Sequence, residues 1–201
     1  MAASTNKQDV QERVRELFDF IEKQGQADYI GEAVSQLQHS LQAAQYAVDS
    51  HADDDTVLGA LLHDIGRFIP ASEKMPAQIA ADGTFVGRAS HEIIGAQYLK
   101  QLGFNDKVCQ LVEAHVMAKR YLATDQDYYN SLSKSSKATL RYQGGIFNDA
   151  QKREAEKDPY LQDKLMVRRW DDLAKDPDAV TLPLSYYEDM AVNSLMRTPH
   201  G

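Results

Sequence analysis

Apolar residues recur at steps of three and four along most of the chain, which is the spacing of one face of an α-helix. The first such stretch covers residues 9–23, and its apolar positions are Val10, Val14, Leu17, Phe18 and Ile21. The same spacing predicts further helices over residues 41–48, 56–62, 91–103, 107–121, 127–132, 136–142, 150–157 and 160–173, with a last one after Pro183. No stretch shows the alternation of a convincing strand. We therefore expect an all-α fold, one helical domain over residues 1–201 with an N-terminal helix region at 1–27.

One predicted helix has a polar face where a packing helix should be apolar. Asp28 is a plausible N-cap, and Tyr29, Glu32, Gln36 and His39 follow at steps of three, four and three, which would place them on one face. A polar face directed inward is typical of a binding site rather than of a core.

Residues 68–90 form the longest predicted connection, with two prolines and two glycines. A connection of this length within a compact domain is usually functional or mobile. We expect it to be irregular and to serve as a possible lid.

Composition narrows the class of protein. The chain has 201 residues, 43% of them hydrophobic, and a formal net charge of −8, which argues against non-specific binding to nucleic acid or to an anionic membrane. A local basic pocket is still compatible with that charge. The single cysteine, Cys109, excludes an intrachain disulfide, and neither a signal peptide nor a membrane-spanning run is visible. These features predict a cytoplasmic protein that acts on a small molecule.

The stretch 58–67 ends an apolar helical run with the adjacent pair His63-Asp64, and Gly66 then stops the helix. Three other histidines, His39, His91 and His115, lie at or near predicted helices. Each histidine taken singly is more often structural than metal-binding. Imidazole and carboxylate ligands together suit iron, manganese or zinc better than calcium, and the lack of further cysteines argues against a structural zinc cluster.

This pattern resembles the HD-domain superfamily, in which a histidine, a His-Asp pair and a distal carboxylate hold a metal ion. Here they would be His39, His63-Asp64 and Asp171. His91 and His115 match the subset of the superfamily that holds two metals, with Asp64 as the bridge. The resemblance thus implies a buried dinuclear site with six metal ligands: His39, His63, Asp64, His91, His115 and Asp171.

A closer resemblance rests on residues 28–33, 36–42, 115–122 and 142–145. These segments are similar to the PhnZ-like family of HD-domain mixed-valent diiron oxygenases, which cleave the carbon–phosphorus bond of 2-amino-1-hydroxyethylphosphonate. The resemblance implies two iron ions, Fe(II) and Fe(III), as cofactors and O2 as co-substrate. The expected products are phosphate and a carboxylic acid such as glycine, from this phosphonate or an N-methylated analogue.

Spacing adds two candidates for binding the phosphonate. Lys119 lies one helical turn beyond His115, and Arg168 lies one turn before Asp171, so both cations would project beside the metals. Ser135 and Ser136 could add donors, although a helix cap explains them equally well. A solvated surface lysine is the alternative for Lys119.

The resemblance assigns the other end of the substrate to the polar face that begins at Tyr29. Tyr29 and Glu32 would meet an amino group, with Tyr29 on an iron position until substrate displaces it, and Gln36 would join them. Arg67 stands where a member of the family has histidine, which predicts a different pocket size or substrate. We expect His63, Asp64, Tyr29 and Lys119 to be the catalytic residues.

Two other functions use the same motifs. A metal-dependent HD phosphohydrolase would cleave a nucleotide or another phosphate ester by attack of a metal-bound hydroxide on phosphorus. Such an enzyme in its one-metal form would not need His91 and His115. A catalytically silent HD module that binds a nucleotide or a partner would lack metal ligands, and none is missing here.

Overall fold

The structure is a computed structural model that describes residues 6–29, 32–79, 81, 83 and 85–197. Within this part of the chain it contains ten α-helices, and the expected all-α fold is confirmed. The helices are α1 Lys7–Gln24, α2 Gln36–Asp49, α3 Asp54–Leu62, α4 His91–Leu102, α5 Asp106–Leu122, α6 Gln126–Ser131, α7 Lys134–Tyr142, α8 Asp149–Ala155, α9 Leu161–Leu173 and α10 Glu188–Arg197. Three short 3-10 helices, η1 Ile65–Arg67, η2 Pro70–Lys74 and η3 Leu184–Tyr187, complete the helical elements.

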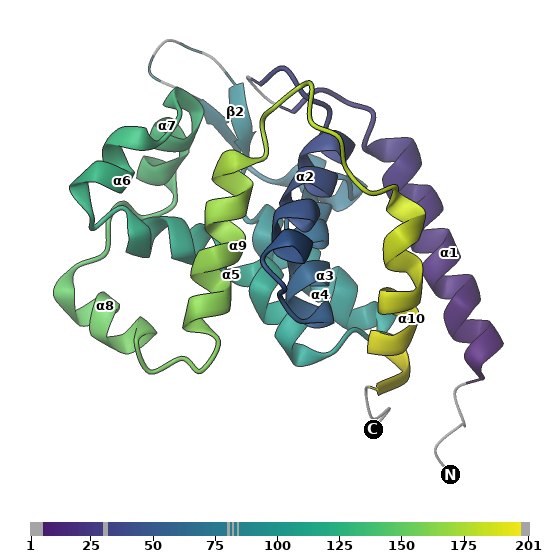
Figure 1. Cartoon of the computed structure of the whole chain (residues 1–201). Coiled ribbons are helices and arrows are strands. Elements are labelled where there is room, and N and C mark those ends of the chain that lie inside the picture. The colour runs from purple at the N-terminus through teal and green to yellow at the C-terminus, as the bar shows by residue number, and fades with distance from the viewer. Residues whose placement is uncertain (1–5, 30–31, 80, 82, 84, 198–201) are drawn as a thin grey trace.

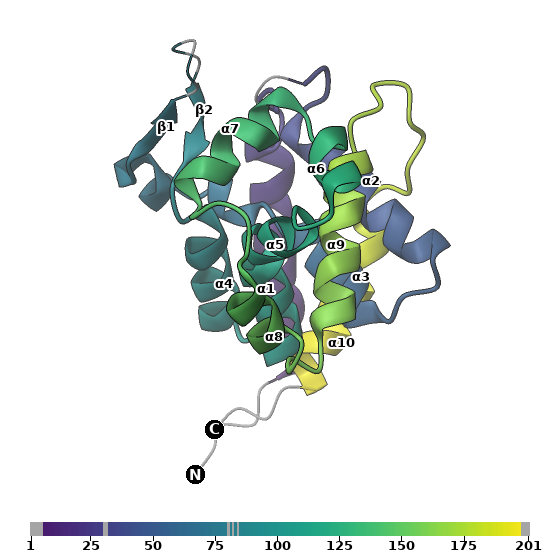
Figure 2. The same ribbon diagram turned by 90° about the vertical axis from the view of Figure 1, so that its left-hand side faces the viewer.

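Helix α5 lies at the centre of the molecule and packs against α3, α4 and α9 (Figure 1). Asn105 caps its first turn by accepting a hydrogen bond from the backbone N–H of Val108. Its apolar residues are buried on more than one face, so it is a core helix rather than a surface helix. These buried residues include Val108, Leu111, Val112 and Ala118. Helix α1 packs against α10, so the first and last helices of the described chain lie side by side (Figures 1 and 2).

The prediction of a helix that begins at Asp28 is wrong. Asp28 instead pairs with Ser35 in an isolated antiparallel bridge, and the turn between them contains Tyr29 and Glu32. Helix α2 begins at Gln36 because Ser35 and Gln38 form a capping box, in which each side chain accepts a hydrogen bond from the other's backbone N–H. Two residues of this turn, 30 and 31, lie outside the described part of the chain.

The segment 68–90 is more ordered than the sequence predicts. It contains η2 and an antiparallel hairpin of β1 Ala77–Ile79 and β2 Phe85–Arg88, so the expectation of no strand was wrong at this point. Both strands contact α7 (Figure 2), and Tyr142 on that helix donates a hydrogen bond to the backbone oxygen of Ile79. Motion of this segment as a lid stays a prediction.

None of the helices described here has the length and apolar character that a bilayer span requires.

Candidate metal centre and substrate cavity

The His-Asp pair lies at the end of α3, where the α-helix gives way to η1. His63 and Asp64 are both buried, at 0% and 3% exposure. Gly66 directly after them allows the first turn of α4 to come very close, since a Cβ added at Gly66 would lie 1.9 Å from the backbone oxygen of His91. This close approach brings His91 next to Asp64.

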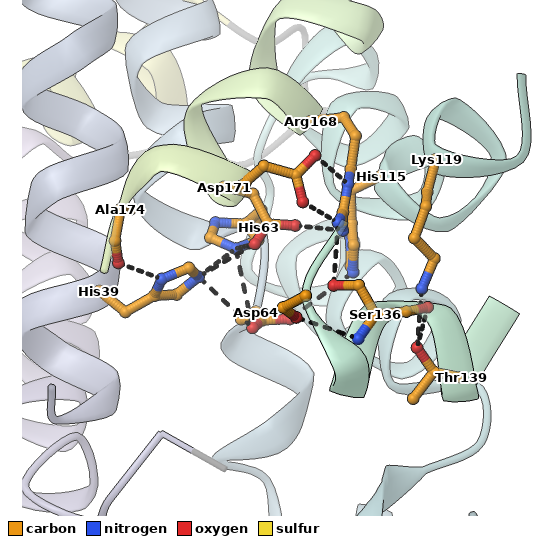
Figure 3. A network of polar contacts seen from close by, with 12 residues as sticks. His39, His63, Asp64, His115, Lys119, Ser136, Thr139, Arg168, Asp171 and Ala174 are labelled. Carbon is orange, nitrogen blue, oxygen red and sulfur yellow. Dashed lines mark hydrogen bonds and ion pairs between the residues drawn. The ribbon is translucent and has the colours of Figure 1, made fainter. Parts of the chain in front are cut away.

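Three buried residues form the first group of possible metal ligands: His39 on α2, His63 after α3 and Asp171 on α9. The Nε2 atoms of His39 and His63 are 3.0 Å apart. The Oδ1 atom of Asp171 lies 3.3 Å from His39 Nε2 and 3.8 Å from His63 Nε2. Three helices therefore converge on one small space, and Figure 3 shows these side chains directed toward one another.

Asp64, His91 on α4 and His115 on α5 form the second group. The two histidine Nε2 atoms are again 3.0 Å apart, and Asp64 Oδ1 lies 3.3 Å from that of His91 and 3.6 Å from that of His115. All three residues are buried.

Asp64 faces both groups. Its Oδ1 atom points to the second group, whereas Oδ2 lies 3.9 Å from His39 Nε2 and 3.7 Å from His63 Nε2. Arg67 Nε is 2.8 Å from Oδ2. Burial would raise the pKa of Asp64, but the nearby Arg67 and His63 outweigh it and hold that pKa well below its usual range. A buried, ionised carboxylate that directs one oxygen to each group is suited to bridge two cations.

Backbone carbonyl groups orient the imidazoles of His39, His63 and His115. The Nδ1 atom of His39 lies 2.8 Å from the oxygen of Ala174. His63 and His115 make the corresponding contact at 2.8 Å with the oxygen of the residue three positions earlier in their own helix. Because Nδ1–H donates to a carbonyl, the lone pair of Nε2 is turned toward the centre, as in histidine ligands of metals. His91 Nδ1 lies 3.5 Å from a carboxylate oxygen of Glu92.

The donor atoms fit a pair of metal ions. Metal–nitrogen bonds of about 2.1 Å at right angles place two ligand atoms roughly 3 Å apart, which is the Nε2 separation seen in both groups. Burial lowers the pKa of His63 and of His115, and His91 lowers that of His115 further. These two imidazoles are therefore kept in the neutral form that coordination requires. The nitrogen and carboxylate donors suit iron, manganese or zinc.

A cavity opens beside the two groups, and His91, His115 and Asp171 lie in its wall. Seven of the eight residues predicted to bind substrate also line it: Tyr29, Glu32, Arg67, Lys119, Ser135, Ser136 and Arg168. The space is small, about 40 Å³ for the centres of water molecules, which suits a ligand of few atoms.

Lys119 presents a buried ammonium group to this cavity. Its side chain is 3% exposed, and among the described residues its hydrogen-bond partner is the hydroxyl of Thr139, at 2.9 Å (Figure 3). Burial lowers the pKa of Lys119 to about 7, and the positive charge of Arg168 adds to the effect. An ammonium group that is buried without a carboxylate partner is poised to bind an anion.

Arg168 on α9 is a second buried cation, but carboxylates already hold it. Its Nη1 atom lies 2.5 Å from Asp171 Oδ2, and its other nitrogens contact Asp172. Nη2 is also 3.5 Å from Ser136 Oγ on α7. Arg168 therefore fixes a metal-ligand candidate and presents part of its guanidinium to the cavity.

The turn before α2 supplies Tyr29 and Glu32. The Tyr29 ring stacks on His39 with centroids 3.9 Å apart, and its hydroxyl lies 3.5 Å from Asp171 Oδ1. Burial and the charge of Asp171 raise the pKa of Tyr29 well above its usual value. The Glu32 carboxylate is 2.8 Å from Nζ of Lys175. The predicted substrate contacts thus lie at the cavity although the predicted helix is absent.

Residues 37–175 match the sequence model of the HD domain, a range that contains all six ligand candidates. The chain belongs to the HD-domain family.

Curated relatives of this HD-domain protein include two phosphonate dioxygenases. It is 40% identical over 165 residues to the hydroxymethylphosphonate dioxygenase of Gimesia maris, a match that covers 82% of this chain and 79% of the relative. It is 34% identical over 177 residues to the glycine-betaine-forming [1-hydroxy-2-(trimethylamino)ethyl]phosphonate dioxygenase of Leisingera caerulea, covering 88% and 85%. An uncharacterised protein of Acanthamoeba polyphaga mimivirus is 33% identical over 98% of the chain and 89% of its own length. The predicted resemblance to HD-domain phosphonate oxygenases is confirmed.

For some residues of the HD-domain site, the position differs from the one predicted from the sequence, and other residues of the site were not predicted. Gln36 is not among the described residues that line the cavity; it is the first residue of α2. Ser133, rather than Ser135 or Ser136, caps α7, by accepting a hydrogen bond from the Ser136 N–H.

Thr139, Gln78 and Lys175 line the cavity and were not predicted. Thr139 lies one turn beyond Ser136 on α7, so the helical spacing from Ser136 could have predicted that it faces the cavity. Gln78 on β1 and Lys175 reach the site only through tertiary packing, which no local pattern reveals.

Proposed function

We propose that the protein uses O2 to cleave the carbon–phosphorus bond of an α-hydroxyphosphonate, with two iron ions bound by the six ligand candidates. The products are phosphate and the carboxylate formed from the hydroxyl-bearing carbon. The observation that carries the proposal is Asp64, which directs one oxygen to His39 and His63 of the first group and the other to His91 and His115 of the second. The names of two relatives as phosphonate dioxygenases support the same activity.

The overall reaction balances with O2 as the oxidant. For hydroxymethylphosphonate the products are formate, phosphate and one proton, because both oxygen atoms of O2 enter the products. The C–P bond breaks, the carbon is oxidised to a carboxylate, and O2 accepts four electrons. When bound, the irons would supply the redox chemistry with O2 and Lewis acidity toward substrate oxygens.

The residues around the irons position the substrate. His39, His63, His91 and His115 would hold the metals through Nε2, in the orientation that their Nδ1 contacts fix. Lys119 would bind phosphonate oxygens, because it is the buried cation that lacks a carboxylate among the described residues. Ser136 and Arg168, which both line the cavity, would add donors beside it.

Tyr29 lies against the first group of ligand candidates. Its ring covers His39 and its hydroxyl is directed to Asp171, so it would exclude water from the first group until substrate enters. The raised pKa of Tyr29 keeps its hydroxyl protonated near neutral pH, and this proton can be donated to a substrate oxygen.

A phosphohydrolase of the HD family is the alternative. In its one-metal form it would not depend on His91 and His115, whereas here the Nε2 atoms of both lie 3.3 and 3.6 Å from Asp64 Oδ1. The names of the relatives favour the oxygenase. A silent module is disfavoured because no ligand position is lost.

The test is iron loading under anaerobic conditions, followed by admission of O2 with hydroxymethylphosphonate or 2-amino-1-hydroxyethylphosphonate while phosphate is measured. We expect phosphate and a carboxylate in equal amounts, and only when O2 is present. A nitrophenyl phosphate ester serves as the hydrolase substrate. Release of phosphate from the ester without O2, together with no reaction of either phosphonate, would overturn the oxygenase in favour of the hydrolase.

A further inference from the structure

An ion pair at the cavity has no part in the reaction as proposed. Lys175 Nζ lies 2.8 Å from Glu32 Oε1, and both side chains, at 20% and 19% exposure, line the same cavity as Lys119. Glu32 belongs to the turn before α2, and Lys175 follows the end of α9, so the pair joins segments 143 residues apart. Lys175 thus pairs with the carboxylate of Glu32, which the family resemblance assigns to the amino group of a substrate.

The pair lies away from the phosphonate-binding residues. Ala174, the residue before Lys175, contacts His39, and Figure 3 shows Ala174 and Lys119 on opposite sides of the ligand cluster. A substrate whose phosphonate is held by Lys119 therefore directs its other end toward Glu32 and Lys175. That end carries the group by which α-hydroxyphosphonates differ from one another.

A cationic group would meet an unfavourable environment there. The guanidinium of Arg67 lies 5.7 Å from the centre of the Tyr29 ring, and the ring also stacks on His39. The aromatic surface is thus already in contact with a cation. An ammonium group would have Lys175 and Arg67 as neighbours, and it would reach Glu32 only by displacing the ammonium of Lys175.

We propose that Lys175 is a specificity-determining residue that disfavours substrates with a cationic end by holding the carboxylate of Glu32. Substrates whose second end is small and uncharged enter without breaking the pair. This inference rests on the proposed function. Since the pair is only partly buried, its effect on relative kcat/KM is on the order of tenfold.

The test compares two substrates in the iron-loaded protein, hydroxymethylphosphonate and 2-amino-1-hydroxyethylphosphonate, by phosphate release. We expect the wild-type protein to prefer hydroxymethylphosphonate, which has no cationic group. Lys175→Met frees Glu32 and should move the ratio of kcat/KM values about tenfold toward the amino compound, mainly through KM. Lys175→Arg keeps the pair and should keep the wild-type preference.

Two further variants separate specificity from folding. In the double variant Glu32→Gln with Lys175→Met, no carboxylate is freed, so the gain for the amino compound should disappear. Lys107→Met is the matched control: Lys107 is 18% exposed and pairs with Asp53 and Asp163, and its loss should leave the substrate ratio unchanged.

The outcomes are distinguishable. If phosphate is released but the ratio is the same in wild-type and Lys175→Met protein, or if the wild-type protein prefers the amino compound, the role of Lys175 is overturned and the proposed function stands. If neither phosphonate releases phosphate, both proposals fail.

Discussion

Lys119 is expected to reduce the stability of the protein while serving its activity. The unfolded chain keeps a lysine pKa of about 10.4, whereas burial and the charge of Arg168 lower it to about 7 in the folded protein. The difference of about 3.4 pH units, at about 1.4 kcal/mol per unit, means that the charged form destabilises the folded state by about 5 kcal/mol.

This destabilisation depends on pH in a defined direction. Below about pH 7 Lys119 is protonated in both states, so the full effect is present. Between about pH 7 and pH 10 the folded protein has lost this proton and the unfolded chain has not, so the effect falls as pH rises. Lys119→Met should therefore raise the free energy of unfolding of the metal-free protein by several kcal/mol at about pH 6 and by little near pH 10.

Urea unfolding of chelator-treated protein at about pH 6, 8 and 10 measures the effect. Lys107→Met is the control with the opposite sign, because Asp163 and Asp53 outweigh burial and raise the pKa of Lys107. In the iron-loaded protein, Lys119→Met should lower kcat/KM for a phosphonate on the order of a hundredfold, since it removes a buried cation. An equal stability difference at every pH, or destabilisation by Lys119→Met at about pH 6, would refute the reasoning.

Three other predictions concern a metal-ligand candidate, a close backbone contact and the buried cysteine. His91→Ala removes a ligand from the second group alone, so iron content should fall from two to one per chain by metal analysis and turnover should be lost; two irons and full turnover would contradict the dinuclear site. Gly66→Ala places a methyl group 1.9 Å from a backbone oxygen and should cost about 3 kcal/mol in unfolding free energy, whereas Gly59→Ala meets side-chain atoms of Leu111 at 2.7 and 2.8 Å and should cost less; equal losses would be inconsistent with the close approach. Burial raises the pKa of Cys109 to about 11, so a thiol reagent near pH 8 should label it only after unfolding; rapid labelling of the native protein would show the thiol to be accessible.

Hydrophobic spacing was sufficient to locate the long helices, because each of them buries a regular apolar stripe. Helices α1, α5 and α9 begin and end within about two residues of the expected positions. The spacing gave a wrong helix start at Asp28. Steps of three and four predict which residues share a helix face, but they do not determine where the helix begins. Ser35 and Gln38 carried that information in the sequence as a capping box.

The hairpin at 77–88 was not predicted because its strands have only three and four residues, which is too short for an alternating pattern to be recognised. Its contacts with α7 lie outside the segment itself. Secondary structure that depends on tertiary packing leaves little trace in local sequence.

The ligand candidates could be assembled from the sequence because histidines and carboxylates at these positions match a known pattern. The resemblance supplied the grouping that spacing alone leaves open. The pairing of Glu32 with Lys175 had no such signal, since the two residues are 143 positions apart and each is an ordinary surface type. The sequence thus predicted the chemistry common to the family better than the feature that would set this chain's specificity.

The contacts between the imidazoles and backbone oxygens have a consequence for how the metals are acquired. His63 and His115 are each held by a carbonyl in the preceding turn of the same helix, and His39 by one just beyond α9. The rings are thus set by the fold before any ion arrives, in contrast to small zinc domains that fold only on binding their metal. We therefore expect that the protein folds without metal and that a chelator removes bound ions without unfolding the chain.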